Sequence, residues 1–350
     1  PNHERASIAI EAMRHGKDVM TDKPGCVSLD QLEALRRTVA ETGRIWSVNF
    51  SERFEVRAVT RALELVREGA IGEVVHTTGL GPHRLNRHLR PAWFFERKRY
   101  GGILADIGSH QCDQFLAFTG AKEASVVAAR VANLANPADP GLQDFGEAML
   151  RAGRASGYFR VDWYTPDGLP TWGDGRLFVL GTEGYLELRK YVDIAGAPGV
   201  DHLFLVDRKG VRKIDCADAE LPYYRLLIED VLERSERAMP QAHAFAATEL
   251  ALRAQALAEA RAGGLDEATR RALEAQRDRL RARLAEEEAR LTGPLAAAWD
   301  AADAAARPAL LEAFKRGLAT RAYLRTAIED LERALGAEEG TADHVAHRRH

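Results

Sequence analysis

The sequence has little cysteine and no long hydrophobic run. Its 350 residues include three cysteines, Cys26, Cys112 and Cys216, which are odd in number and lie far apart. This spacing offers neither a disulfide framework nor a zinc cluster, so we predict no metal site and expect the thiols to pack as small apolar groups in a reducing compartment. No apolar stretch is long enough to cross a bilayer, so no membrane partner is expected.

An excess of charge of either sign is also missing. The 49 Lys and Arg residues are matched by 52 Asp and Glu residues, which gives a formal net charge of −3. This balance provides no electrostatic reason to expect nucleic acid or an anionic membrane as a partner. The chain begins at Pro1 without a charged and apolar leader pattern, and the cytoplasm is the default prediction for its location.

The first fifty residues alternate between helical and strand patterns. Helices are predicted over residues 3–15 and 29–42, and strands over 17–24 and 44–50. This order, with short connections, favours a parallel sheet with crossover helices. Ligands of such sheets bind at the carboxyl ends of the strands, where Lys23 and Asn49 lie in this sequence.

The middle of the chain changes character after a predicted helix around residues 54–69. Several short β-rich runs follow between residues 72 and 214, and GRLFVLGTEGYLELRK (175–190) has the pattern of a hairpin that turns through residues 181–184. These runs predict a large, mostly antiparallel sheet. Two helices are expected after it, over roughly 221–237 and 243–262.

The last part of the chain, from Gly263 onward, is rich in Ala, Arg, Glu and Leu. One apolar stripe contains Leu273, Leu280, Leu284 and Leu291, and a second contains Leu311, Phe314, Leu318, Leu324, Ile328, Leu331 and Leu335. We interpret this part as a helical hairpin or small bundle that serves packing or dimerisation. The terminal His344, His347 and His350 are interpreted as part of a frayed polar end, with a metal site as the alternative.

The stretch GGILADIGSHQCDQF (101–115) places ionisable side chains among apolar ones. In a helix, Asp106, His110 and Asp113 share one face, because they are spaced i, i+4 and i+7. Ionisable groups in apolar surroundings are costly unless they are paired or used. The stretch therefore contains either a satisfied core histidine near a helix N-terminus or an acid/base histidine beside an orienting carboxylate.

Four segments resemble a known family in both order and spacing. They are PNHERASIAIEAMRHGKDVMTDKP (1–24), RYGGILADIGSHQCDQFLAFTG (99–120), GTEGYLEL (181–188) and ATELALRAQALAEA (247–260). Together they resemble the Gfo/Idh/MocA oxidoreductases over residues 1–262. The resemblance implies a Rossmann domain followed by an α/β domain with a large open sheet, whereas the helical tail lies outside it.

This resemblance implies a division of the chain and an activity. Residues 1–53 would be the second half of a Rossmann domain, 54–262 an α/β substrate and oligomerisation domain, and 263–350 a helical extension. The implied activity is hydride transfer between NAD or NADP and a sugar, inositol or related polyol, by a homo-oligomer that pairs through its open sheets. The alternatives are a non-catalytic substrate-domain remnant joined to a helical interaction module, and an NAD-dependent glycosidase.

The resemblance also implies catalytic roles for Lys23, Asp106 and His110. Hydride transfer at an alcohol carbon requires a proton to leave or reach the oxygen, and a histidine suits this task. A carboxylate one turn away can orient the imidazole, and a lysine can polarise the reacting oxygen. Asp106 has an alternative role as a cap of the helix that follows it.

Further site residues follow from the same resemblance. The expected cofactor contacts are Asn2, His3, Asp22, Lys23, Pro24, Asn49 and Arg53, and the expected substrate contacts are His83, Arg84, Arg90, Trp93 and His110. Asp22 stands where the family usually has Glu, and Arg53 has a surface salt bridge as its alternative role. The loop 83–100 is either a substrate-site loop or a solvated basic loop, and His83 and His88 are not predicted to bind metal.

One family feature is missing from the sequence. A G-x-G-x-x-G turn normally holds the cofactor pyrophosphate, but GLGPHR (79–84) and GDGRLF (173–178) lack the third glycine and lie among β-rich segments. We therefore expect the chain to be a fragment that lacks the first βαβ stretch, with open strand edges. Whether such a chain binds NAD or NADP by itself is left open at this point.

Overall fold

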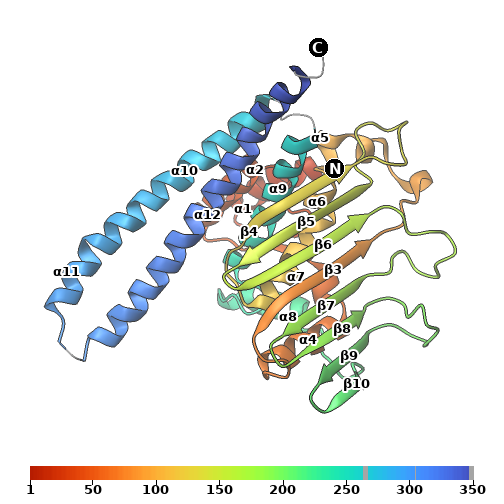
Figure 1. The fold of residues 1–350 in the computed structure, drawn as a ribbon, viewed down its shortest axis with the longest axis horizontal. Coiled ribbons are helices and arrows are strands. Elements are labelled where there is room, and N and C mark those ends of the chain that lie inside the picture. Colours follow the sequence, from red (N-terminus) through yellow and green to blue (C-terminus); the bar gives the residue numbers. More distant parts are fainter. Residues whose placement is uncertain (263–266, 304, 347–350) are drawn as a thin grey trace. The chain divides into compact units, whose positions relative to one another are not determined.

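The computed structural model describes residues 1–262, 267–303 and 305–346, and it forms two compact units, Pro1–Ala258 and Glu259–His350 (Figure 1). The first unit opens with the 3-10 helix η1 (Asn2–Glu4), α1 (Arg5–Arg14), β1 (Val19–Asp22), α2 (Leu29–Thr42) and β2 (Trp46–Asn49). β1 and β2 are parallel, with Asp22 opposite Asn49. The predicted helices, strands and parallel pairing are thus confirmed.

Helix α2 begins and ends where its sequence signals predict. The Ser28 hydroxyl accepts a hydrogen bond from the Gln31 backbone N–H at 3.3 Å, which caps the first turn. The Gln31 side-chain oxygen accepts from the backbone N–H of Val27, one residue before the cap. Gly43 ends the helix in a left-handed conformation (φ 62°) that glycine adopts without strain.

An eight-stranded sheet forms the centre of the first unit. Its strands are β3 (Val74–Pro82), β4 (Ser125–Ala132), β5 (Phe145–Ala152), β6 (Ala155–Asp162), β7 (Arg176–Gly181), β8 (Gly184–Arg189), β9 (His202–Asp207) and β10 (Gly210–Ile214). Their order is β10-β9-β8-β7-β3-β6-β5-β4. Neighbouring strands are antiparallel except for the parallel pair β3 and β6, so the predicted, mostly antiparallel sheet and its β7–β8 hairpin are confirmed.

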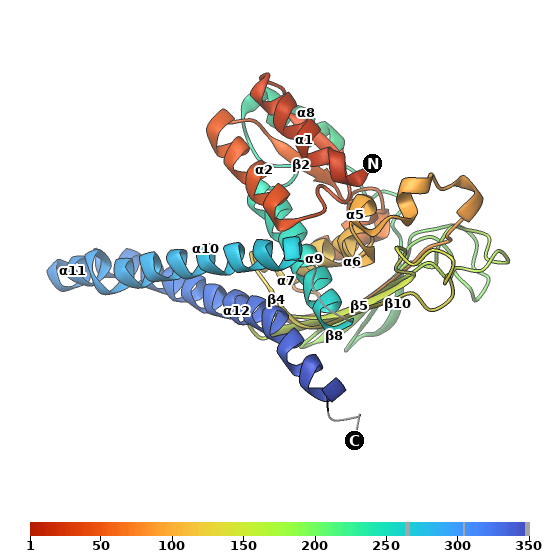
Figure 2. The ribbon, with the colours of Figure 1, turned by 90° about the horizontal axis from the view of Figure 1, so that it is seen from above.

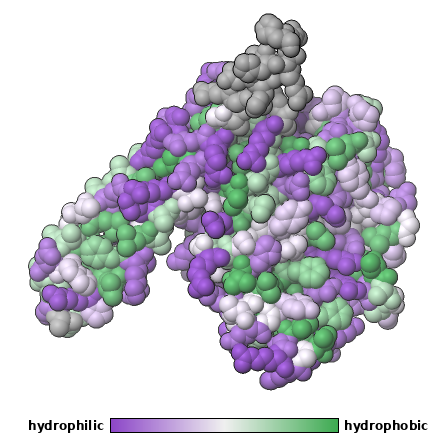
Figure 3. Space-filling model, in the orientation of Figure 1, coloured by the Kyte–Doolittle hydropathy of each residue, from purple (hydrophilic) through white to green (hydrophobic). Residues whose placement is uncertain are grey.

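The helices of this unit lie on one side of the large sheet (Figure 2). Besides α1 and α2 they are α3 (Ser51–Phe54), α4 (Arg57–Arg67), α6 (Ile103–Asp106), α7 (Gly108–Thr119), α8 (Tyr223–Glu233) and α9 (Gln241–Ala262), with the short η2 (Arg87–Leu89), η3 (Ala92–Phe95) and α5 (Arg97–Tyr100) in the loop before α6. Within the described residues of the first unit no helix covers the other face, here called the open face, which carries apolar and polar side chains side by side (Figure 3).

Two predicted helices have different bounds in the structure. The helix expected over 54–69 begins later, as α4 at Arg57, because Val56 is extended (φ −117°, ψ 110°), and the short α3 before it was not predicted. The helix expected over 221–237 ends at Glu233, because Arg234 takes a left-handed conformation (φ 56°). The stretch 101–115 is divided, since α6 ends at Asp106 and α7 begins at Gly108.

The second unit is a helical hairpin, as predicted. It consists of α10 (Glu267–Thr292), α11 (Pro294–Ala301) and α12 (Arg307–Ala346), and α10 packs along α12. The buried leucines Leu273, Leu280 and Leu291 belong to the first predicted stripe, but Leu311 and Leu318 of the second stripe are 45% and 52% exposed. The side chains of His344, His347 and His350 lie outside the described residues. No described helix has both the length and the hydropathy needed to cross a membrane.

Candidate active site

Lys23 and Asp106 form an ion pair at the carboxyl end of β1. The Nζ atom of Lys23 donates to Oδ1 of Asp106 at 2.8 Å, and both side chains are largely buried. The guanidinium of Arg5 donates to the carbonyls of Asp22 and Pro24, both at 3.0 Å, and to that of Lys23, and so holds the turn that carries the lysine. A cis peptide bond joins Lys23 to Pro24. The structure therefore brings together two of the predicted catalytic residues.

His110 is buried in the first turn of α7, and its ring lies edge-on to Phe50 with centroids 6.4 Å apart. Its Nδ1 atom is buried and has no hydrogen-bond partner among the described residues. Burial lowers the pKa of His110 to about 3; the Glu52 carboxylate opposes this effect and the Lys23 ammonium adds to it. The imidazole is therefore neutral at physiological pH, with one of its two ring nitrogens unprotonated.

Asp106 does not orient His110 as expected from the helical spacing. Ile107 between α6 and α7 keeps helical dihedrals (φ −76°, ψ −39°), but the carboxylate of Asp106 is directed to Lys23. Asp106 does not cap α7 through its side chain either, since that helix has no side-chain cap hydrogen bond. What Asp106 does instead is fix the position of the Lys23 ammonium.

His83 is a second imidazole in the same surroundings. It follows β3, and its ring packs against Trp163 and Trp172 with centroids 5.5 and 4.4 Å apart. Its Nδ1 lies 3.1 Å from the carbonyl oxygen of Gly81, so Nδ1 carries the proton and Nε2 is the basic atom. Burial and, to a smaller extent, the Lys23 ammonium together lower the pKa of His83 to about 4.

A buried ion pair lies beneath these groups. The Nζ atom of Lys190, just after β8, donates to Oε2 of Glu52 in α3 at 2.8 Å and to Oε1 of Gln114 at 2.7 Å. Gln111 and Gln114 donate to the same Glu52 oxygen at 3.0 and 3.3 Å. Burial favours the neutral acid, but the Lys190 ammonium holds the pKa of Glu52 well below its usual value.

Sequence reasoning missed Glu52 and Lys190. The two residues are 138 positions apart, and no local pattern links them. The one available signal was the charged pair in FSERF (50–54), where Glu52 and Arg53 follow a predicted strand between two phenylalanines.

The glycines of GLGP (79–82) have a packing role. A Cβ atom at Gly79 would lie 2.1 Å from Oε1 of Gln111, and one at Gly81 would lie 2.9 Å from Nε2 of the same side chain. The two glycines thus allow Gln111 of α7 to lie directly on β3.

Asp113 was predicted to share a helix face with Asp106 and His110. In the structure it joins the helices α3, α7 and α9. Its carboxylate accepts from Nε and Nη2 of Arg53 at 2.7 and 2.6 Å, and Nε2 of His243 lies 2.8 Å from Oδ1. Arg53 also stacks on Phe54, with its guanidinium carbon 4.0 Å from the ring centroid. The Arg53 ion pair is therefore a buried one rather than the surface salt bridge considered as an alternative.

The other predicted cofactor contacts lie around the ends of β1 and β2. The buried Asn2 amide donates to the Tyr100 carbonyl at 2.8 Å, Asp22 is exposed, and Pro24 is buried. Asn49 donates to Glu55 and Tyr224, both at 3.0 Å. Oδ1 of Asn49 and Nδ1 of His3 are buried without a partner in the described part of the chain.

The loop 83–100 is fixed rather than freely solvated. Arg84 donates to the carbonyls of Pro166 and Leu169 at 2.8 and 2.6 Å. The guanidinium of Arg90 lies 4.6 Å from the ring centroid of Phe94 and 4.9 Å from that of Trp163, and Trp93 is half-buried. These contacts tie the loop to the segment 162–176.

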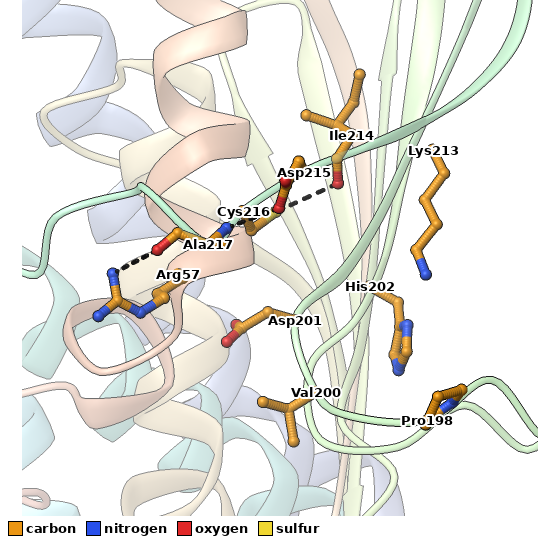
Figure 4. A pocket seen from close by; sticks show the side chains of 10 residues that line it. All are labelled: Arg57, Pro198, Val200, Asp201, His202, Lys213, Ile214, Asp215, Cys216 and Ala217. Atoms are coloured by element: carbon orange, nitrogen blue, oxygen red, sulfur yellow. Dashed lines mark hydrogen bonds between the residues drawn. The ribbon is translucent and has the colours of Figure 1, made fainter.

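A separate pocket lies at β9, β10 and the start of α4 (Figure 4). It encloses about 440 Å³ and is lined by Arg57, Pro198, Val200, Asp201, His202, Lys213, Ile214, Asp215, Cys216 and Ala217. Arg57 donates to the carbonyl of Ala217 at 3.2 Å, and Asp201 accepts from the Ala58 N–H at 2.9 Å. None of the predicted site residues lines this pocket, and within the described ranges no group of three or more His, Cys, Asp or Glu side chains is arranged to hold a metal ion.

Comparison with known proteins identifies the family. The GFO/IDH/MocA C-terminal domain matches residues 59–187. A solved structure from Erwinia carotovora atroseptica SCRI1043, described as an oxidoreductase, is 48% identical, with a TM-score of 0.70 over 72% of this chain and 76% of that one. The chain belongs to the Gfo/Idh/MocA family of oxidoreductases. The resemblance inferred from the sequence motifs is thereby confirmed.

Two further proteins that resemble this chain are informative. The scyllo-inositol 2-dehydrogenase (NAD⁺) of Bacillus subtilis is 29% identical over 207 residues, which are 57% of this chain and 57% of that protein. A levoglucosan dehydrogenase in complex with NADH and levoglucosan has the same fold, with 20% identity and a TM-score of 0.61 over 74% of this chain and 76% of that one. The chain thus spans little more than half the length of the Bacillus relative.

Proposed function

We propose that this protein is a NAD(P)-dependent oxidoreductase that acts on a sugar, inositol or related polyol. The observation that carries the proposal is the clustering of the Lys23–Asp106 ion pair with His110 at the carboxyl end of β1. The names of its relatives, a scyllo-inositol dehydrogenase and a levoglucosan dehydrogenase, support the class of substrate. The catalytic residues of the proposal are Lys23, Asp106 and His110.

The residues near the strand ends fit the nicotinamide end of NAD or NADP. Two polar atoms there, Oδ1 of Asn49 and Nδ1 of His3, are buried and have no partner among residues that the structure describes. Buried polar atoms of this kind are usually satisfied by a ligand or water. We assign cofactor contacts to Asn2, His3, Asp22, Lys23, Pro24, Asn49 and Arg53. The bound cofactor supplies the hydride acceptor or donor.

The chain's own residues handle the proton. In alcohol oxidation, the Lys23 ammonium, held by Asp106, hydrogen-bonds the substrate oxygen and stabilises the negative charge that develops on it. Neutral His110 accepts the hydroxyl proton, and it returns the proton in the reverse reaction. His83, Arg84, Arg90 and Trp93 are proposed to line the substrate side, with Nε2 of His83 as an acceptor for a substrate hydroxyl.

The proposal extends to assembly, location and domain organisation. One row on the open face of the sheet runs through Met149, Tyr158, Thr78, Phe178, Glu187 and Phe204, which are paired in register across six strands. Met149 is 49% exposed, and we propose this face as the contact between copies in a homo-oligomer. The cytoplasm is the proposed location, and residues 1–53, 54–262 and 263–350 are the proposed domains.

Cofactor titration and turnover test this proposal. We expect NADH or NADPH to bind with a change in nicotinamide fluorescence, and scyllo-inositol or levoglucosan to be oxidised when NAD⁺ or NADP⁺ is supplied as the hydride acceptor. His110→Ala should lower kcat by about 10²–10⁴-fold, the range typical of a lost acid/base group. His88→Ala is the matched control, because His88 is exposed and has no assigned role.

The outcomes separate the alternatives. Absence of binding to both cofactors would contradict the proposal and favour a non-catalytic domain. Product analysis distinguishes the glycosidase alternative, because that enzyme would cleave a glycosidic bond without net accumulation of reduced cofactor. Equal turnover in His110→Ala and His88→Ala would remove His110 from the mechanism.

A further inference from the structure

Among the buried atoms near the catalytic cluster that lack hydrogen-bond partners, two have complementary chemistry. One is Nδ1 of His110, and the other is Oε1 of Glu52; neither has a partner within residues 1–262, 267–303 and 305–346. Leaving a buried polar atom unsatisfied costs about 1–3 kcal/mol, so each such atom calls for an explanation. A protonated Nδ1 is a donor and a carboxylate oxygen is an acceptor, so each atom can satisfy the other.

The contacts of Glu52 leave this one oxygen free. Lys190, Gln111 and Gln114 all donate to Oε2. The Lys190 ammonium keeps the carboxylate ionised in spite of its burial. Glu52 is thus a fixed negative charge with an uncommitted oxygen.

The backbone of His110 is tied to the same cluster. The Gln114 side chain donates to the His110 carbonyl at 3.0 Å, as well as to Glu52. The other charged or titratable groups that act on the imidazole are Lys23 after β1, His83 after β3 and Lys190 after β8. Glu52 is the group that favours a protonated imidazole in this set, whereas the other three disfavour it.

We propose that Glu52 is the positioning carboxylate of His110. It accepts a hydrogen bond from Nδ1–H, directly or through one water, and thereby holds the imidazole in the tautomer whose Nε2 is free to take the substrate proton. When Nε2 takes that proton, the carboxylate stabilises the imidazolium that forms. Asp106 was expected to have this role from its spacing, but its carboxylate is engaged by Lys23. The catalytic consequence rests on the proposed function, whereas the tautomer assignment does not.

The test is the tautomer of His110, measured by ¹⁵N NMR on protein with ¹⁵N-labelled histidine at pH 7, without cofactor or substrate. Comparison with His110→Gln assigns the signals. We expect the Nδ1–H form to predominate in the wild type. In the paired variant Glu52→Met/Lys190→Met, which removes both buried charges together, the ratio of the two tautomers should move toward Nε2–H by roughly tenfold or more, as expected for a lost hydrogen bond to a charged group.

The chain offers a matched control on the same two helices. Arg53→Met/Asp113→Asn removes the other buried ion pair between α3 and α7, and it should leave the tautomer ratio of His110 unchanged. A second variant, Glu52→Gln/Lys190→Met, retains an uncharged acceptor oxygen and should give an intermediate ratio. An Nε2–H tautomer in the wild type, or equal shifts in the Glu52 and Asp113 variants, would overturn the proposal.

Kinetics then separate this inference from the proposed function. If the enzyme turns over, Glu52→Met/Lys190→Met should lower kcat by about 10–10³-fold with little change in KM, because positioning of the base affects the transition state more than substrate binding. A larger effect on KM than on kcat would contradict the positioning role. If the enzyme does not turn over, the NMR result still decides whether Glu52 fixes the tautomer.

Discussion

Two buried carboxylates of the first unit, Glu52 and Asp113, lie close to each other in the fold but are used differently. Both oxygens of Asp113 are engaged, by Arg53 and by His243. Glu52 receives its three donors on Oε2, and its Oε1 has no partner among the described residues. A carboxylate with both oxygens engaged can only hold its neighbours in place. A carboxylate with one free oxygen can still accept a hydrogen bond from a group nearby that becomes protonated.

The difference also affects the histidines. His243 hydrogen-bonds to Asp113, whose two oxygens are both engaged, and so joins α9 to α7. His110 lies near Glu52, and its Nδ1 atom has no hydrogen-bond partner among the described residues. The comparison therefore separates a structural cluster around Asp113 from the proposed catalytic cluster around Glu52 and His110, called the reactive cluster below. Three perturbations test this separation, beginning with the largest expected effect.

Asp113→Ala should destabilise the fold strongly without altering the state of His110. Removal of one partner leaves the Arg53 guanidinium buried and unpaired, which typically costs about 3–5 kcal/mol. Urea unfolding followed by circular dichroism measures the loss. The added substitution Arg53→Met should restore part of the stability. A loss below about 1 kcal/mol would show that the cluster is not the anchor described here.

Gly79→Ala should have a smaller effect that reaches the reactive cluster. The added methyl group would meet Oε1 of Gln111 at 2.1 Å and push that side chain away from Glu52. Overpacking together with one weakened hydrogen bond is expected to cost about 1–2 kcal/mol. Gly168→Ala is the matched control, because a Cβ there meets nothing within 4 Å. Equal unfolding midpoints for the two variants would contradict the close packing of Gln111 on β3.

The pH dependence of stability tests the burial of neutral His110. Its pKa is lowered from 6.5 to about 3 in the folded protein, so below pH 6.5 the unfolded chain binds a proton that the folded chain does not. The free energy of unfolding should therefore fall with decreasing pH, by about 1.4 kcal/mol per pH unit for this residue.

Unfolding curves at pH 7, 6 and 5 for the wild type and His110→Gln measure this contribution. The variant should lose less stability on acidification, and the difference in slope belongs to His110, because other groups, His83 among them, titrate in both proteins. Parallel curves would mean that His110 titrates normally in the folded state.

Local sequence signals predicted much of the fold. The bounds of α2 follow from its Ser28 cap and Gly43 stop, and the hairpin of β7 and β8 follows from the turn at 181–184. Contacts between segments that are distant in the sequence could not be predicted from such local signals. The i, i+4 spacing of Asp106 and His110 suggested a pair, but the partner of the Asp106 carboxylate is Lys23, which lies 83 positions away in the sequence.

The helical tail illustrates the same limit. Its apolar stripes predicted a hairpin correctly, but Leu311 and Leu318 are exposed in the structure. Periodicity gives the side of a helix that can be buried, whereas the length over which a neighbour covers it depends on the course of the partner helix. In the site, likewise, residue types were predictable and their partners were not.

The link between Glu52 and Lys190 has a consequence for how the protein is made. The two residues lie 138 positions apart, so the ribosome must deliver nearly all of the large sheet before this ion pair can close. Pairings so distant in sequence form slowly and late in folding. In the proposed mechanism, proton transfer is then possible only once β8 has docked, and an incompletely folded chain has no activity.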